Sequence, residues 1–298
     1  LTGTIPPCLG QLLELEKLEL GGNSLTGPVP SELCNISTLV YLLLADNALT
    51  GTIPPCLGQL PALEWLSLGP NALTGSVPSE LCSLSSLQLL YLNDLPQLSW
   101  TMPPCFATNL TSLQSLIANS AGLTGELPQE WTLPNLGQLI LSDNAIHGKL
   151  PSTWRTPALA GILLSNNKHL SGTLPSSLVA QPLLSFIAIE GARLDGQLPT
   201  ALCRASKLQS LFLSGNKISG PLPSCITNAS NLQKLRLAHN NLDGELPRDL
   251  ERWLHLIELD LSYNSFRGRV HAGLGTLAPQ LSMTRLDFNH LACDLPRS

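Results

Sequence analysis

The stretch LTGTIPPCLGQL at residues 1–12 recurs without change at residues 49–60, an offset of 48 residues. A related segment, NSLTGPVPSEL, begins at Asn23 between the two copies, so the true period is half of that offset. Sequence similarity at a fixed period of 20 to 50 residues is typical of repeat architectures such as solenoids. The sequence therefore predicts a chain built from one unit of about 24 residues, used again and again.

The period extends over the whole chain. It follows the pattern L-x-x-L-x-L-x-x-N-x-L-x-G-x-(I/L/V)-P, and its Asn serves as a marker for each repeat. The marker positions are Asn23, Asn47, Asn71, Leu95, Ala121, Asn144, Asn167, Ala192, Asn216, Asn240, Asn264 and Asn289. Residues 1–298 are therefore predicted to form a single array of about twelve coils. Both ends fall within a coil, so we expect the chain to be part of a longer protein that supplies capping units.

Each repeat contains the pattern of one short strand. Leucines eight, five and three residues before the marker, such as Leu15, Leu18 and Leu20 before Asn23, end in an alternating pair with one buried face. Gly and Pro after the marker turn the chain back across the array. The marker Asn is predicted to be a buried amide that bonds to backbone groups of the turn. Leu95, Ala121 and Ala192 lack that amide, so we expect a loosened turn or altered curvature near them.

These units resemble leucine-rich repeats of the plant-specific subclass, whose mark is the segment L-x-G-x-I-P. NSLTGPVPSEL from Asn23, NALTGTIPPCL from Asn47 and NKISGPLPSCI from Asn216 carry the resemblance, which covers essentially all 298 residues. It implies an α/β solenoid, a horseshoe or superhelix with a parallel β-sheet on the concave face and short 3-10 or irregular segments on the convex face. Similar repeats occur in ectodomains of receptor-like kinases and receptor-like proteins, in secreted inhibitors of polygalacturonases and in a plant antifreeze protein.

Eight cysteines fall almost entirely into two columns of the repeat. Cys8, Cys56, Cys105 and Cys225 lie two residues after a Pro, Cys34, Cys82 and Cys203 lie two residues further on, and Cys293 fits neither column. Pairing each later-column cysteine with the earlier-column cysteine of the next coil predicts disulfides Cys34–Cys56, Cys82–Cys105 and Cys203–Cys225. Adjacent coils about 5 Å apart allow such bonds. Free cysteines in small core sites are the alternative.

The cysteines and three glycosylation sequons indicate an oxidising compartment. The sequons begin at Asn35, Asn109 and Asn228, in the same part of their repeats, where a glycan can project from the outer arc. We therefore predict a secreted or cell-surface glycoprotein.

Composition and motifs argue against several other classes of function. A net charge of −5 and a pI near 5.7 leave no basic field for nucleic acid. No apolar run approaches the ~18 residues of a membrane span, so no membrane contact is expected within this segment. Phosphate-binding, esterase and zinc motifs are missing from the sequence, so neither an enzyme nor a cofactor is expected. His290 and Cys293 are a weak candidate for a metal pair. Trp131, Trp154 and Trp253 are predicted to pack in the core.

The exposed side of the strands carries the functional prediction. Residues six and four before each marker point away from the core, and in most repeats they are apolar or aromatic. Ten of them form what we call the sheet strip: Tyr41, Leu43, Trp65, Leu89, Tyr91, Ile117, Ile140, Leu163, Phe186 and Phe212. In the last coils Lys234, Arg236, Glu258, Asp260 and Arg285 replace them, and we expect a solvated ladder of cross-strand ion pairs rather than an ion-binding patch.

Two classes of function fit this surface. As an extracellular recognition module, the protein would bind a protein or peptide partner through the sheet strip, since aromatic side chains are frequent anchors of interfaces. Inhibition of a secreted hydrolase would be a special case. As a structural or surface-binding protein, for example in a cell wall or on ice, it would present a flat array of small polar residues. The sheet strip is neither small nor polar, so recognition is the preferred prediction.

Overall fold

A computed structural model describes residues 1–270 and 281–292. The chain forms two compact units. Unit 1 comprises residues 1–147 and 155–159, and unit 2 comprises residues 148–154 and 160–298. Both units are built from the same repeat, in which a strand, a turn, a second short strand and a short helix follow one another.

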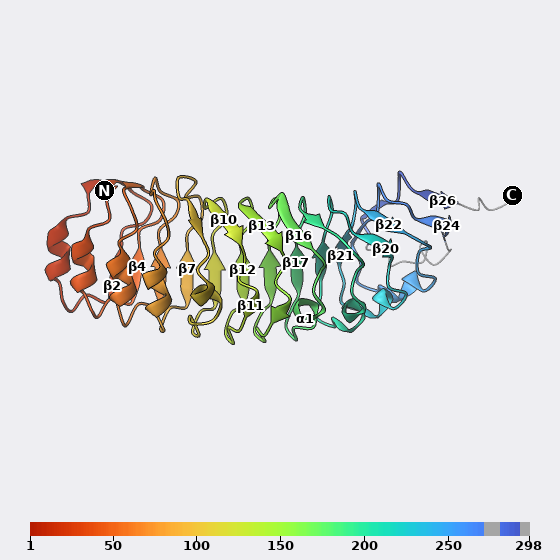
Figure 1. Cartoon of the computed structure of the whole chain (residues 1–298), viewed down its shortest axis with the longest axis horizontal. Helices are drawn as coiled ribbons and strands as arrows, with labels where there is room; N and C mark the ends of the chain where they lie inside the picture. Colours follow the sequence, from red (N-terminus) through yellow and green to blue (C-terminus); the bar gives the residue numbers. More distant parts are fainter. Residues whose placement is uncertain (271–280, 293–298) are drawn as a thin grey trace. The chain divides into compact units, whose positions relative to one another are not determined.

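The strands that contain the paired leucines form the main sheet of each unit, with all neighbours parallel (Figure 1). In unit 1 the order is β2 (Lys17–Glu19), β4 (Tyr41–Leu43), β6 (Trp65–Ser67), β7 (Leu89–Tyr91), β9 (Ser115–Ile117) and β12 (Gln138–Ile140). In unit 2 it is β15 (Gly161–Leu163), β17 (Phe186–Ala188), β19 (Ser210–Phe212), β21 (Lys234–Arg236), β23 (Glu258–Asp260) and β25 (Met283–Arg285). Equivalent residues of successive repeats are paired, for example Leu18 with Leu42, so each column of the sequence becomes a column on the sheet.

A second set of short strands follows the turn after most markers. They are β1 (Thr2–Thr4), β3 (Ser24–Pro28), β5 (Ala48–Thr50), β8 (Trp100–Thr101), β10 (Leu123–Glu126), β13 (Ala145–Lys149), β16 (His169–Gly172), β18 (Arg193–Leu194), β20 (Ser219–Pro221), β22 (Asn241–Asp243), β24 (Arg267–Arg269) and β26 (His290–Ala292). Two further strands, β11 (Glu130–Trp131) and β14 (Thr153–Trp154), come later in their repeats, where most other repeats have a short helix. Gly at the end of the L-x-G step makes this packing possible. Gly27 has φ +74°, and a Cβ there would lie only 2.9 Å from Cγ2 of Thr4 in the preceding repeat.

Short helices close most repeats, nearly all of them 3-10. They are η1 (Pro7–Gln11), η2 (Ser31–Asn35), η3 (Pro55–Gln59), η4 (Ser79–Ser83), η5 (Pro104–Ala107), α1 (Ser176–Val179), η6 (Thr200–Arg204), η7 (Ile226–Asn228) and η8 (Leu250–Arg252). A proline precedes most of these helices, and in η1, η3 and η5 a second proline lies in the first helical turn, which its fixed φ suits. Bonds from i+3 to i, such as Leu9 N–H to Pro6 O (3.1 Å), hold the helices. These segments and the parallel sheets confirm the predicted solenoid class.

The core of each unit is a stack of leucines with a few large rings. Leu42, Leu66 and Leu90 are fully buried, as are the equivalent leucines of other repeats. The prediction that Trp131, Trp154 and Trp253 pack in the core is confirmed, since none is more than 3% exposed. Trp131 Nε1 also donates to the carbonyl of Pro128 (3.0 Å). In η1 the equivalent proline carbonyl, that of Pro6, accepts instead from the backbone N–H of Leu9.

The marker asparagines form the ladder that the sequence predicts. Nδ2 of Asn240 donates to the carbonyls of Leu237 (3.1 Å), Ala238 (3.2 Å) and, one repeat earlier, Leu213 (2.9 Å), and its Oδ1 accepts from Ile218 N–H (3.0 Å). The same four kinds of contact occur at Asn47, Asn216 and Asn264. Each amide therefore ties its own turn to the preceding repeat.

At Leu95 and Ala121, where the sequence predicts a loosened turn or altered curvature, other side chains hold the turns. Asn93 and Asn119 each lie two residues before the missing marker. Asn93 Oδ1 accepts from the N–H of Asn119 (2.9 Å), and Asn119 Oδ1 accepts from the N–H of Ser142 (2.8 Å). Leu95 and Ala121 themselves are fully buried. An amide displaced by two residues therefore continues the links between repeats.

Three disulfides join helices of neighbouring repeats. They are Cys34–Cys56, Cys82–Cys105 and Cys203–Cys225, with Cα–Cα distances of 5.8, 5.7 and 5.3 Å. These are the three pairs given by the column rule. Cys8 is a free and exposed thiol, whereas Cys293 lies outside the described residues.

Candidate functional site

The unit 1 part of the sheet strip lies on the solvent side of the main sheet. Its members are Tyr41, Leu43, Trp65, Leu89, Tyr91, Ile117 and Ile140. The central residue of each strand is buried while its neighbours on both sides are partly exposed, because successive side chains of a strand alternate between the two faces. Trp65 is 39% exposed, an unusual state for the largest apolar side chain.

The aromatic rings of this part are arranged before any partner binds. Tyr41 and Trp65 meet edge to face with ring centroids 5.1 Å apart, and Nζ of Lys17 lies 4.7 Å from the centroid of the Tyr41 ring. Asn93 Nδ2 donates to the hydroxyl of Tyr91 (3.2 Å). These contacts restrict the rotamers of the anchors, which lowers the entropy lost when a partner binds.

The unit 2 part of the sheet strip is shorter. Leu163, Phe186 and Phe212 are half-buried, and the two phenyl rings meet edge to face at 5.3 Å. The guanidinium of Arg236 lies over the other side of the pair, 4.5 Å from the centroid of Phe212. The apolar surface of unit 2 thus ends at a charged cluster.

The charged cluster differs from the solvated ladder that the sequence predicts. Arg236 pairs with Glu258 through two hydrogen bonds, one from Nε and one from Nη2 (3.1 Å). The register places Lys234 directly opposite Glu258, so the ion pair is diagonal. Asp260 pairs with Arg285 (3.7 Å) and accepts from the Ser262 hydroxyl (2.7 Å). Glu258 and Asp260 are each only 7% exposed.

Donating a hydrogen bond to Glu258 raises the pKa of Arg236 above its ordinary value, helped by the charge of Glu258 and, less, by those of Glu190 and Asp260. Partial burial opposes this rise. Arg236 therefore stays charged at any physiological pH. It lines a pocket of about 540 Å³ in unit 2, together with Glu258, Asp260 and Arg285.

His239 and Tyr263, which line this pocket, belong to a stack of three rings that the sequence did not predict. His239, Tyr263 and Phe288 immediately precede the markers Asn240, Asn264 and Asn289. Successive ring centroids lie 4.1 Å apart, and all three residues have φ between 52° and 55°. A left-handed conformation is rare for aromatic residues. An aromatic ring directly before the marker in three successive repeats is therefore the sequence signal that could have revealed the stack.

The remaining site predictions lie elsewhere on the units. Asn35, Asn109 and Asn228 are exposed at or just after helices η2, η5 and η7. Within the described residues, no group of three or more His, Cys, Asp or Glu side chains could hold a metal ion. Over the same part of the chain, no helix has the length and apolar character needed to cross a bilayer.

Comparisons with known proteins agree with this architecture. The family described as Leucine Rich Repeat matches residues 14–36, 38–60, 207–229, 231–253 and 255–277. The ectodomain of the Arabidopsis thaliana receptor kinase GASSHO1/SCHENGEN3, solved with CASPARIAN STRIP INTEGRITY FACTOR 2, is 33% identical (TM-score 0.79, 97% of this chain, 38% of that chain). A TDR receptor is 29% identical (TM-score 0.82, 99% and 55%). The plant peptide hormone receptor RGFR1, solved with RGF2, is 27% identical (TM-score 0.55, 98% and 58%). No curated protein sequence matches the chain.

The chain spans less than two thirds of each of these three receptor structures. What this chain shares with them is the fold, as the TM-scores show. The sequence repeats, the fold and these similarities together place the chain among the plant-type leucine-rich repeat proteins.

Proposed function

We propose that this protein is an extracellular recognition module that binds a protein or peptide partner through the sheet strip. The observation that carries the proposal is the row of partly exposed apolar side chains on the unit 1 sheet, with Trp65 at 39% exposure. A large contiguous apolar patch on the surface of a protein usually marks an interaction site. The RGFR1 structure, in which a leucine-rich repeat receptor is solved with RGF2, supports a peptide as one class of partner.

The chemistry of the strip favours polypeptide recognition over catalysis. In unit 1 it offers aromatic and aliphatic contact area with two hydroxyls, those of Tyr41 and Tyr91, and the Tyr91 hydroxyl already accepts a hydrogen bond from Asn93. Such a surface gains free energy by excluding water, as the centre of a protein interface does.

The alternative, a structural or surface-binding role, would use a different face. Thr2, Thr26 and Thr50 are small polar residues that are exposed on β1, β3 and β5, at equivalent positions of the sequence repeat. However, the hydroxyl of Thr26 donates to the carbonyl of Gly3 (3.3 Å), and Thr74 bonds to Gly51 (3.2 Å) in the same way. These hydroxyls stabilise the second sheet, so the sheet strip remains the stronger candidate.

The proposal is tested by substituting Trp65 and Tyr91, which lie on the adjacent strands β6 and β7. A partner is first identified by mass spectrometry of proteins that co-purify with the full chain. Its affinity for the variants Trp65→Ser and Tyr91→Ser is then measured by calorimetry. Loss of a central aromatic anchor should cost at least about 2 kcal/mol of binding free energy, roughly 30-fold in Kd. The melting temperature should change little, because both side chains are partly exposed.

Leu13→Ser is the matched control, since Leu13 is an apolar side chain of unit 1 that is 57% exposed and lies outside the strip. It should leave Kd unchanged. Phe212→Ser tests the unit 2 part separately. Unchanged binding by both Trp65→Ser and Tyr91→Ser would show that the strip is not the binding surface.

A further inference from the structure

A second surface of unit 1 is repeated residue for residue. After the second strand of each repeat the chain passes through an x-(I/V)-P step, and three such steps side by side enclose a groove. The first groove contains Thr4, Ile5, Pro7, Val29, Pro30, Ser31 and Glu32, and the second contains Thr52, Ile53, Pro55, Val77, Pro78, Ser79 and Glu80. The two sets are the same residue types at an offset of 48 positions. Each groove has a volume of about 520 to 540 Å³.

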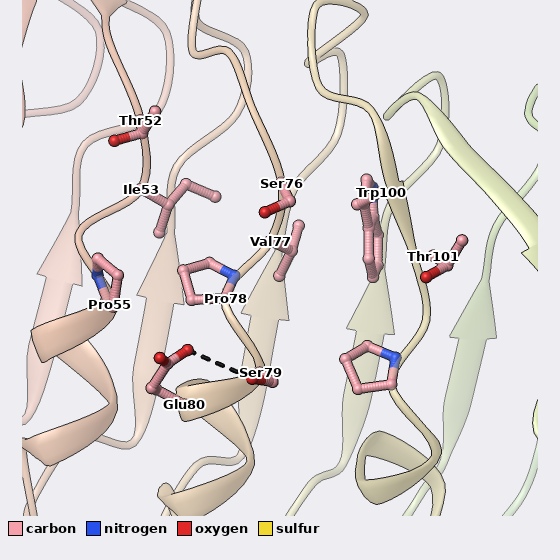
Figure 2. Close-up of a pocket in the computed structure, with 11 residues that line it drawn as sticks. Thr52, Ile53, Pro55, Ser76, Val77, Pro78, Ser79, Glu80, Trp100 and Thr101 are labelled. Atoms are coloured by element: carbon pink, nitrogen blue, oxygen red, sulfur yellow. Dashed lines mark hydrogen bonds between the residues drawn. The ribbon is translucent and has the colours of Figure 1, made fainter.

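The two grooves are continuous, because Thr52 and Pro55 line both. Figure 2 shows the second groove, in which residues of three successive coils lie side by side and the rings of Pro55 and Pro78 face the same opening. Trp100 lines the far end. The result is one trough in unit 1 that extends along the direction in which the coils stack.

The walls of the trough combine apolar rings with a regular negative charge. The exposed proline rings are those of Pro7, Pro28 and Pro55, whereas Pro78 is buried with Ile53 and Val77, which are at most 4% exposed. Glu32 and Glu80 occupy equivalent places and are exposed, and each carboxylate accepts only a long hydrogen bond from the neighbouring serine, 3.5 Å from Ser31 and 3.4 Å from Ser79. Neither groove is lined by a Lys, Arg or His. The carboxylates therefore have no basic partner in the trough.

The spacing of the repeated features matches one type of polypeptide. Neighbouring parallel strands lie about 4.8 Å apart, so equivalent points two coils apart are separated by about 9.6 Å. A polyproline II helix rises about 3.1 Å per residue with three residues per turn, and it presents the same face every 9.3 Å or so. A segment in this conformation that lies along the trough would place every third residue next to an equivalent set of wall residues.

We propose that this trough binds a proline-rich segment of a partner in the polyproline II conformation, with a basic residue at every third position. Prolines of the segment pack on the exposed rings of Pro7, Pro28 and Pro55. The basic side chains reach Glu32 and Glu80. The trough does not include any residue of the sheet strip, so this inference is independent of the proposed function.

The test uses the full chain and two labelled peptides of identical composition, measured by fluorescence anisotropy. The first is (Pro-Pro-Lys)5, in which the lysines align on one face. The second contains the same residues with irregular lysine spacing. The regular peptide should bind about tenfold more tightly, and its binding should weaken as salt concentration rises, because exposed charges are screened. Equal affinity of the two peptides would overturn the proposal, since it would show that only net charge matters.

Substitutions separate the trough from the rest of unit 1. Glu32→Gln and Glu80→Gln should each weaken binding of the regular peptide about threefold, and the double variant about tenfold, as expected for exposed ion pairs. Glu14→Gln makes the same charge change at an exposed residue outside the trough and should have no effect. Trp65→Ser should also have no effect, so failure of the proposed function and failure of this inference are distinguishable.

A steric variant gives an independent result. Thr52→Lys adds bulk and positive charge where the two grooves join. The fold accepts this residue, because Lys149 packs over Gly172 in the way that Thr52 packs over Gly75. Thr52→Lys should abolish binding of the regular peptide without lowering the melting temperature. Unchanged binding of the regular peptide by this variant and by the double variant Glu32→Gln/Glu80→Gln would reject the trough as a polyproline site.

Discussion

At the residue scale, two adjacent positions define most turns. The marker Asn supplies the amide. Except at Asn71, which follows Pro70, the residue before the marker adopts a left-handed conformation. That residue is Asp46, Asp94, Asp143 or Asn166 in four turns, types that tolerate positive φ. In the last repeats the position holds His239, Tyr263 and Phe288 instead, and their stacked rings provide contacts that a short side chain would lack. The sequence shows which turns depart from the rule, but the stacking follows only from the spacing of the coils.

The ladder amide makes a sharp stability prediction at Asn240. Asn240→Ala removes four hydrogen bonds and leaves the carbonyl of Leu213 and the N–H of Ile218 without their partner in a buried region. At about 1 kcal/mol per bond, partly offset by relaxation, the free energy of unfolding should fall by about 3 kcal/mol in urea denaturation. The neighbouring variant Asn241→Ala, at an exposed residue, should change it by less than about 0.5 kcal/mol. Equal effects of the two variants would contradict the ladder as a source of stability.

At the element scale, the short helices and the strands differ in how far their contacts follow from sequence. The column rule gives the disulfides because consecutive 3-10 helices stack at one coil spacing, which brings Cys34 and Cys56 to a Cα–Cα distance of 5.8 Å. The ion pairs do not follow from register in the same way. Glu258 lies opposite Lys234 on β21, yet the longer, forked side chain of Arg236 reaches it diagonally and makes two bonds. Side-chain reach and competing partners decide such pairs.

The helix-to-helix disulfides should stabilise unit 1 measurably. Cys34→Ser with Cys56→Ser opens a loop that spans 22 residues between η2 and η3, and the chain-entropy account gives a loss of about 3 kcal/mol in the free energy of unfolding. Differential scanning calorimetry of the oxidised proteins measures the effect. Cys8→Ser changes a free, exposed cysteine of the same column and should leave the transition where it is. A double variant as stable as the control would mean that the disulfide does not constrain the unfolded chain.

At the scale of the whole molecule, periodicity explains why so much could be predicted. One repeat fixes strand, turn and helix, so the solenoid class, the three disulfide pairs and the outward side of each strand all follow from one alignment of the chain with itself. The features that break the repeat could not be obtained in this way. Asn93 and Asn119 replace the marker amide from two residues away, and Glu258 and Asp260 are buried by the long side chains around them. The proline trough depends on a volume that three successive coils enclose, which no single repeat contains.

The three sequons give a prediction about the molecule as it leaves a eukaryotic secretory pathway. Asn35, Asn109 and Asn228 are exposed and lie at or just after a 3-10 helix, where a transferred glycan meets no neighbouring strand. Secreted protein treated with a peptide N-glycosidase in heavy-oxygen water should show labelled aspartate at all three positions in peptide mapping. Asn231 is an internal control, because it is exposed three residues after Asn228 but is not part of a sequon, and it should stay unlabelled. The variants Asn35→Gln, Asn109→Gln and Asn228→Gln should each lower the intact mass by one glycan. Unlabelled sequons in secreted protein would contradict the prediction that the outer arc is open to glycosylation. They would also remove the sequons as a reason for predicting an extracellular protein, and only the disulfides would remain.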